Sequence, residues 1–238
     1  MIRGLAQTGL FAVVAVFLAA CAQTGSAPPT LPGEAPPGLP HAFYRQLQAQ
    51  GQPVFRVDAA RSQVVIEVRR GGSLARLGHD HVVASHDVAG NVAPDEGRAD
   101  FQVALDALTV DEPALRAAAG FTTDPDAEDI AGTRRNMHKV LETERHTYVL
   151  LRVTGAAAEG KSDSIRLDVT LHGVTRPVDA VASWAATREE FAASGTFAID
   201  QSAFGITPLS ILGGAITVQD RLNISFRIVA RPVTGAVH

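Results

Sequence analysis

Cysteine is nearly absent from this chain, and its scarcity excludes several kinds of site. The 238 residues include one Cys, which excludes a disulfide scaffold, a zinc site built from Cys ligands and a CxxC redox pair. Lysine is almost as scarce, with Lys139 and Lys161 alone, and the formal net charge is −4. A protein that binds the nucleic-acid backbone needs a basic surface, so we expect no nucleic-acid partner.

Long hydrophobic runs are also lacking, apart from a short one near the N-terminus. Leu10 to Ala20 is apolar, follows Arg3, and is shorter than the ~20 residues that span a bilayer. This pattern is typical of a secretory signal peptide. Leu-Ala-Ala-Cys at 18–21 resembles the lipobox of bacterial lipoproteins, which implies cleavage before Cys21 and acylation of that residue.

The lipobox resemblance leads to a prediction for location. We expect residues 1–20 to be the signal peptide and the product to be a periplasmic lipoprotein, anchored to the membrane through acylated Cys21. Ala22 and Gln23 follow the Cys, without the Asp that often retains such proteins at the inner membrane. This favours the outer membrane.

A proline-rich segment separates this leader from the rest of the chain. Seven of the 13 prolines lie between Ala22 and Pro53, mixed with Gly, Ser, Thr and Gln. Such a composition cannot bury enough apolar surface to fold, so we interpret 21–53 as the lipidated Cys and a tether. A short helix at 41–50 could end it.

Alternation of apolar and polar residues dominates from Val54 onward. It is clearest at 165–171, where Ile, Leu, Val and Leu alternate with Arg, Asp and Thr, and His172 follows. Further strands are expected at 64–68, 79–85, 87–93, 101–105, 146–153, 177–184, 190–199 and 222–228. The exceptions are 111–119 and 130–141, which have helical periodicity. The pattern predicts one all-β domain with a small helical insertion, built as an antiparallel sandwich or barrel.

Four segments carry more specific motifs. In chain order they are Phe-Arg-Val-Asp-Ala-Ala-Arg-Ser at 55–62, a helix-then-strand passage at 135–148, Leu-His-Gly-Val-Thr-Arg-Pro-Val at 171–178, and Ala-Phe-Gly-Ile at 203–206. They resemble, in the same order, motifs of the YceI-like family of bacterial periplasmic lipid-binding proteins. Two departures stand out. Arg61 occupies a position where the family often has His, and 145–150 lacks the usual Phe and Pro.

The resemblance implies a fold and a function for residues 54–232. It implies a lipocalin-like antiparallel β-barrel, in a single domain, with an apolar channel that holds an isoprenoid-type lipid such as a quinone or polyprenyl chain for storage or transport. Inward residues would line the channel: Phe101, Val103, Leu105, Ile165, Leu167, Val169, Leu171, Leu222, Ile224, Phe226 and Ile228. The residues alone leave open that these side chains pack into a filled core. Few aromatic residues are available to fill one.

Two histidines suggest an alternative. His79 and His81 are two residues apart, so on a strand they would project from one face, as metal ligands can. His86, His138, His146 or Asp80 could complete a site for a metal-dependent periplasmic enzyme. No HExxH motif is present, and hydrogen bonding or proton-linked gating by the pair is favoured. We therefore expect a binding protein and not an enzyme, with no metal and no cofactor besides a bound isoprenoid lipid.

The remaining motifs do not predict nucleotide binding or catalysis. Residues 155–162 satisfy the Walker A pattern, but a strand pattern follows where a phosphate-binding loop needs a helix, so a hairpin turn and no nucleotide are expected. Asp106, Asp111, Glu142 and Glu144 are interpreted as acidic residues at turns and helix starts. A non-catalytic envelope interaction scaffold stays open as a further alternative, and so does a homodimer.

Overall fold

A computed structural model describes residues 38–155, 159–161 and 163–233, and every element named below lies in that part of the chain. The helices are α1 (His41–Ala49), α2 (Pro113–Ala118) and α3 (Ala127–Leu141), with short 3-10 helices at Ala59–Arg61, Ala75–Leu77, Pro94–Glu96, Gln201–Phe204 and Leu212–Gly214. The strands are β1 (Phe55–Val57), β2 (Gln63–Val68), β3 (Arg70–Gly71), β4 (His81–Ser85), β5 (Val88–Ala93), β6 (Arg98–Ala104), β7 (Thr109–Val110), β8 (Tyr148–Thr154), β9 (Asp163–Leu171), β10 (Val174–Ala186), β11 (Phe191–Asp200), β12 (Ser210–Ile211), β13 (Ile216–Val218) and β14 (Arg221–Pro232).

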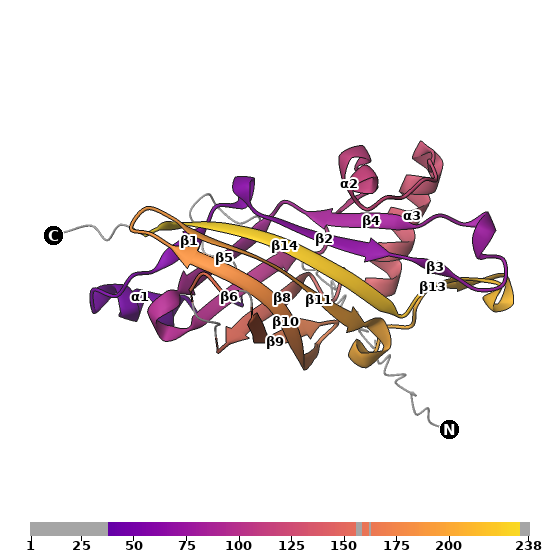
Figure 1. Ribbon diagram of the computed structural model, residues 1–238. Coiled ribbons are helices and arrows are strands. Elements are labelled where there is room, and N and C mark those ends of the chain that lie inside the picture. Colours follow the sequence, from indigo (N-terminus) through magenta and orange to yellow (C-terminus); the bar gives the residue numbers. More distant parts are fainter. Residues whose placement is uncertain (1–37, 156–158, 162, 234–238) are drawn as a thin grey trace, which may run out of the picture. The chain divides into compact units, whose positions relative to one another are not determined.

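The strands form a closed antiparallel barrel, as the sequence predicted (Figure 1). Eight strands follow one another around it in the order β1, β5, β6, β8, β9, β10, β11 and β14, and pairing of β14 with β1 closes the ring. From β8 to β11 each strand pairs with the next one in the chain, whereas β1 pairs with β5, and β2, β4 and β7 continue the sheet beyond β14. An antiparallel barrel of eight strands is wide enough to hold one small ligand.

The last strand, β14, is the seam of the barrel. One edge pairs with β11 from Arg221 to Ala230, and the other edge pairs with two short strands in turn. Phe55 of β1 lies opposite Pro232, while Glu67 of β2 lies opposite Asn223. β1 and β2 thus lie one after the other along the same edge of β14.

A small second sheet extends one end of the barrel. It consists of β12, β13 and β3, with Thr217 of β13 opposite Gly71 of β3. Strands of two or three residues give almost no alternation, so the sequence pattern did not predict this sheet.

Helix α3 is longer than its periodicity predicted, and it starts at Ala127 because Asp126 caps it. The Asp126 carboxylate accepts hydrogen bonds from the backbone N–H groups of Glu128 (2.8 Å) and Asp129 (2.9 Å), and Asp129 reciprocates. This is a capping box, which satisfies donors that the first helical turn leaves free. In the described ranges no helix has both the length and the apolar character needed to cross a membrane.

The strand predicted at 79–85 is shorter than expected. Its first ladder pair is His81 opposite Val68, so β4 begins at His81 and leaves His79 outside the strand. The side chain of Asp80 accepts a hydrogen bond from the backbone N–H of Arg70 (2.9 Å), and this bond replaces a ladder contact. The prediction that His79 and His81 share one strand face is therefore wrong.

Candidate functional site

The barrel surrounds a cavity of about 690 Å³. Its wall includes all eleven side chains that the alternation placed inward: Phe101, Val103, Leu105, Ile165, Leu167, Val169, Leu171, Leu222, Ile224, Phe226 and Ile228. Their contact with a ligand stays a prediction. The volume lies in the range of about 300–1,000 Å³ that small-molecule pockets occupy.

The space exists because the wall is built from aliphatic side chains that do not reach across the barrel. Val169 of β9 and Ile224 of β14 are almost fully buried, yet both border the cavity. Gly195 of β11 lies where a larger residue would not fit between its neighbours. A Cβ on Gly195 would lie 2.8 Å from Cζ of Phe226, itself a cavity residue. The interior is therefore partly packed and partly hollow.

Helix α3 forms one wall at the end of the barrel where β2 ends and β4 begins. Its apolar residues Met137, Val140 and Leu141 border the cavity, while its first half contributes the polar residues Asp129 and Thr133. Both predicted histidines border the cavity at this same end. The cavity thus has a polar part of its wall beside α3.

Asp111 is the centre of the buried polar network at this end, and the sequence reasoning missed it. Its fully buried carboxylate contacts His81 Nδ1 at 2.5 Å and accepts hydrogen bonds from Arg116 Nη1 (2.5 Å) and the backbone N–H of Val82 (3.0 Å). Burial by itself raises the pKa of this carboxyl, but the bonds from His81, Val82 and Arg116 outweigh it and hold the pKa below its usual value. Asp111 also has a left-handed backbone (φ 57°), which the surrounding bonds must maintain.

The two histidines have separate partners. His81 uses Nδ1 for Asp111, and its Nε2 lies 3.3 Å from the hydroxyl of Thr133 on α3. His79 Nε2 lies 3.5 Å from a carboxylate oxygen of Asp129, and its Nδ1 is buried without a hydrogen-bond partner. The ring centroids are 6.2 Å apart. Both rings therefore connect the start of β4 and the residues just before it to α3.

The residues suggested as further metal ligands do not gather around this pair. His86 contacts Glu112 at 2.8 Å, His138 contacts Thr143 at 3.1 Å, and Asp80 is occupied by Arg70. His146 lies elsewhere, with its ring centroid 4.5 Å from that of His172.

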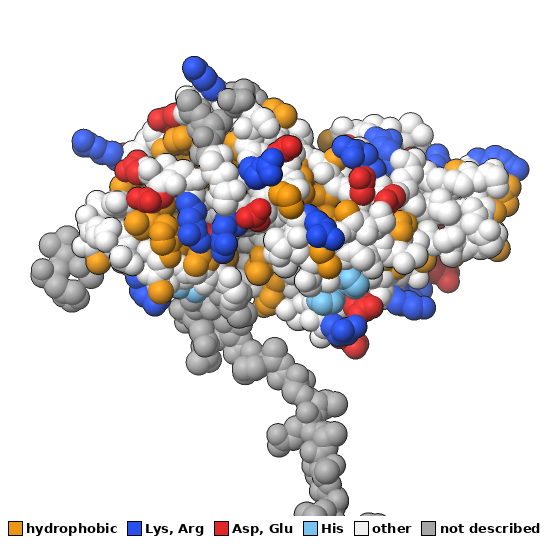
Figure 2. All heavy atoms as spheres, turned by 90° about the horizontal axis from the view of Figure 1, so that it is seen from below, with side chains coloured by type: hydrophobic (Ala, Val, Ile, Leu, Met, Phe, Trp, Pro, Cys, Tyr) orange, Lys and Arg blue, Asp and Glu red, His pale blue; other side chains and the backbone are white. Residues whose placement is uncertain are grey.

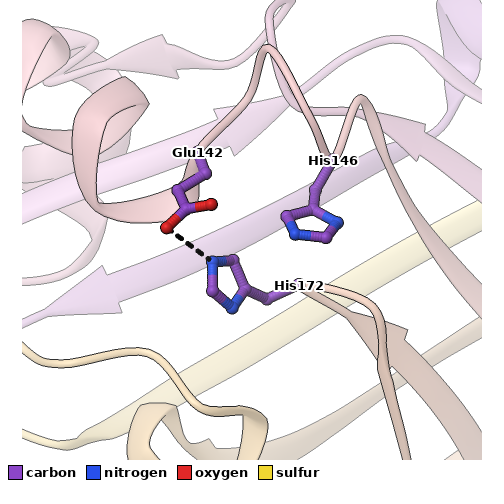
Figure 3. Close-up of side chains that lie close together, drawn as sticks. All are labelled: Glu142, His146 and His172. Carbon is purple, nitrogen blue, oxygen red and sulfur yellow. Dashed lines mark ion pairs between the residues drawn. The ribbon is translucent and has the colours of Figure 1, made fainter.

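A different trio of ligand-type side chains does come together in the described part of the chain: Glu142, His146 and His172 (Figure 3). Their candidate ligand atoms all lie within 4.8 Å of one another. Glu142 follows the last turn of α3, His146 precedes β8, and His172 lies in the turn between β9 and β10. The alternation had placed His172 at the end of a strand, but the two-residue turn with Gly173 begins there.

The barrel carries a third polar cluster, around Asp100 of β6. Its buried carboxylate accepts hydrogen bonds from the hydroxyl of Tyr44 on α1 (2.8 Å), Arg98 (2.8 Å) and Arg152 (2.8 Å). Burial raises the pKa of Asp100, but these three donors outweigh it and lower the pKa below its usual value. Burial and the adjacent Asp100 charge raise the pKa of Tyr44. This cluster fastens α1 to the barrel, and Arg98 also borders the cavity.

Two segments singled out from the sequence fall wholly or partly outside the described residues. Cys21 and the leader lie outside them, as do 156–158 and 162 of the Walker-like segment. The described flanks of that segment are β8, which ends at Thr154, and β9, which begins at Asp163. The segment is thus followed by a strand and not by the helix that a phosphate-binding loop requires.

Comparison with known proteins gives a family and a fold. Residues 55–230 match the YceI-like domain. Among solved structures, BcnA of Burkholderia cenocepacia aligns with a TM-score of 0.52 at 15% identity, over 73% of this chain and 99% of that one. A YceI protein of Campylobacter jejuni aligns with a TM-score of 0.42 at 12% identity, over 63% of this chain and 82% of that one. No curated protein sequence matches the chain. The match extends from β1 into β14 and covers more than half of the sequence, so the chain belongs to the YceI-like domain family.

Proposed function

We propose that this protein is a lipid-anchored periplasmic binding protein that holds an isoprenoid-type lipid, such as a quinone or polyprenyl chain, in the barrel cavity for storage or transport. The family and the barrel fold are consistent with binding of a hydrophobic ligand. The observation that carries the proposal is the cavity of about 690 Å³ with its aliphatic wall. No catalytic residue is required.

The driving force would be burial of the apolar chain. Each buried CH₂ group contributes about 0.8 kcal/mol, before the cost of ordering the chain is subtracted. An isoprenoid also carries a polar head in many of its forms. The polar groups beside α3, with His79 and Thr133 on the cavity wall, supply hydrogen-bonding partners for such a head at one end.

The same end of the barrel offers a route for loading from a membrane. Three exposed large hydrophobic side chains of the described residues lie there: Leu77, Ile211 and Leu212, with exposed fractions of 61%, 46% and 69%. Leu77 and Ile211 also border the cavity. Figure 2 shows orange side chains exposed with basic ones at the end of the molecule where β3 and β13 lie. This apolar rim is suited to contact a lipid surface, and acylated Cys21 would keep the barrel close to one.

Native mass spectrometry and lipid extraction of the purified full-length chain test the proposal. We expect an isoprenoid lipid to copurify in about one copy per barrel. A chain recovered empty, or occupied only by ordinary phospholipid, would contradict it.

Two substitutions at neighbouring positions test whether the lipid is bound inside the cavity. Ala182→Trp adds a bulky ring inside, because Ala182 is buried and borders the cavity. Val181→Trp adds the same ring outside, where the Val181 side chain is 54% exposed. We expect the Ala182 variant to lose most of the bound lipid and the Val181 variant to retain it, measured by extraction from equal amounts of folded protein. Equal retention in both would place the lipid outside the barrel.

A further inference from the structure

Three side chains from separate parts of the chain converge at the C-terminal end of α3. Figure 3 shows Glu142, His146 and His172 pointing toward one another, with their candidate ligand atoms within 4.8 Å. Two imidazoles and one carboxylate form a set of ligands that zinc uses in proteins. In a tetrahedral zinc site the ligand atoms lie about 3.3 Å apart, since each is about 2.0 Å from the metal, so the three need to close by less than about 1 Å each.

The atoms that would bind the metal have few other partners. His172 Nε2 is buried and lacks a hydrogen-bond partner, and it lies 3.8 Å from Glu142 Oε1. The other carboxylate oxygen of Glu142, Oε2, pairs with exposed Arg145 at 2.7 Å. Arg145 therefore leaves Oε1 directed at the imidazole. A buried ring nitrogen without a partner is costly, and a metal ion would satisfy it.

The backbone around the trio is unusual in a way that positions these side chains. Glu142 (φ 47°) and His172 (φ 53°) are two of only four non-glycine residues with positive φ in the described chain. Such conformations carry strain and are enriched at functional sites. Gly173 makes room for the third member, because a Cβ there would lie 3.1 Å from Cε1 of His146.

We propose that Glu142, His146 and His172 bind a divalent transition-metal ion, with Zn²⁺ the best match to the ligand set. The ion would join the end of α3 to the β9–β10 turn. Val140 and Leu141, directly before Glu142, border the cavity, so the ion would fasten one wall of the binding chamber. The site is distinct from the His79 and His81 pair, and it does not depend on which ligand the barrel holds.

The test is a titration of the purified full-length chain, stripped with EDTA, with Zn²⁺ alone. Isothermal titration calorimetry is expected to show one tight equivalent per chain. Co²⁺ in its place is expected to give the visible absorption of a four- or five-coordinate site. Thermal unfolding should shift to higher temperature with Zn²⁺, because the ion binds the folded state.

The variants are chosen to remove ligands while keeping the fold. His172→Asn converts the turn to Asn-Gly, the pair preferred where both turn residues have positive φ. Glu142→Gln keeps the shape of the side chain, and His146→Phe keeps a ring against Gly173. Each should weaken Zn²⁺ binding by at least about tenfold, because losing a residue that merely orients a metal ligand already weakens binding by about that factor. Circular dichroism verifies that each variant is folded.

Two control variants complete the design. His86→Asn removes an exposed imidazole that contacts Glu112, and the His79→Ala, His81→Ala double variant, verified by circular dichroism to be folded, removes the pair that contacts Asp129 and Thr133 in the first half of α3. Both should bind Zn²⁺ as the unaltered chain does. The proposal is overturned if the unaltered chain binds no stoichiometric Zn²⁺, if folded trio variants bind it as tightly, or if the double variant alone loses it.

Discussion

At the scale of single residues, a few buried charges do more than their sequence context suggests. Asp111 looks like an ordinary acidic residue before a helix, and nothing local distinguishes it from Asp106. Its role arises because β4 brings His81 and Val82 to it from thirty residues away and α2 turns Arg116 back onto it. Alternation reports only which face a residue occupies, so it could place the eleven residues on the inward face and could not predict this network.

Replacing Asp111 tests how much the network contributes to stability. Asp111→Asn keeps a residue that tolerates positive φ but leaves the buried Arg116 without its counter-charge. We expect a loss of about 3 kcal/mol in the free energy of unfolding, measured with urea. The matched control is Asp179→Asn, which breaks the exposed pair between Arg166 and Asp179 and should cost less than about 1 kcal/mol. Equal losses would show that the Asp111 network is not a buried ion network in solution.

The lowered pKa values of Asp100 and Asp111 predict acid sensitivity. A carboxyl whose pKa is lower in the folded than in the unfolded chain stabilises the fold above its unfolded pKa of about 3.9. That contribution is lost as the pH falls through the folded pKa. Stability should therefore drop below about pH 4, and Asp111→Asn should show a shallower drop. Urea unfolding between about pH 2 and pH 7 measures how the free energy of unfolding changes with pH in the unaltered chain and in Asp111→Asn. Parallel curves for the two proteins would show that the pKa of Asp111 is not lowered in the folded chain.

At the scale of elements, α3 is the part of the molecule most closely tied to the site. Its first turn meets His79 through Asp129, its middle meets His81 through Thr133, and its end is followed by Glu142 opposite His172. The helical pattern at 130–141 predicted the helix, and its residues Met137, Val140 and Leu141 border the cavity whereas Ile130 does not. The contacts at its two ends could not be predicted, because they join segments that only the closed barrel brings together.

The capping box provides a way to loosen one end of α3. Asp126→Ala removes an acceptor for two backbone N–H groups and should cost about 1 kcal/mol, expressed mainly as fraying of the first turn. Hydrogen–deuterium exchange should become faster at 127–131 and stay unchanged in the barrel strands. Asp124→Ala, an exposed neighbour before the cap, is the control and should leave exchange as it was. Faster exchange over the whole helix would show that α3 opens as one unit.

At the scale of the whole molecule, apolar surface is distributed unevenly. Most large hydrophobic side chains face the barrel interior, while Leu77, Ile211 and Leu212 are exposed around one end of the cavity. The barrel itself followed from alternation and from the family resemblance. The rim did not, because it is built from the short β3, β12 and β13 sheet and from the 3-10 turns around it, and β3 pairs with β13 across more than 130 residues of the chain.

Charging this rim tests its part in lipid uptake. Leu77→Asp combined with Leu212→Asp places two carboxylates where the proposed membrane contact lies, and burial of charge against a lipid surface is unfavourable. Uptake of a quinone from phospholipid vesicles should become several-fold slower, with the amount bound at equilibrium little changed. Val181→Asp charges an exposed hydrophobic position on β10 and should not slow uptake. A similar rate in all three proteins would remove the rim from the loading route.

The seam at β14 has a consequence for the life of the chain before it is folded. Phe55 also pairs with Val92 and Glu67 with Val82, but on their other edge both residues pair with β14, so that edge stays unpaired until residues 221–232 exist. Pairing at such long sequence separation makes folding slow. A nascent chain therefore cannot close its barrel while it is still being synthesised. The strand that is synthesised last is therefore the one that closes the barrel, and the export proposed above would act on a chain whose barrel is still open.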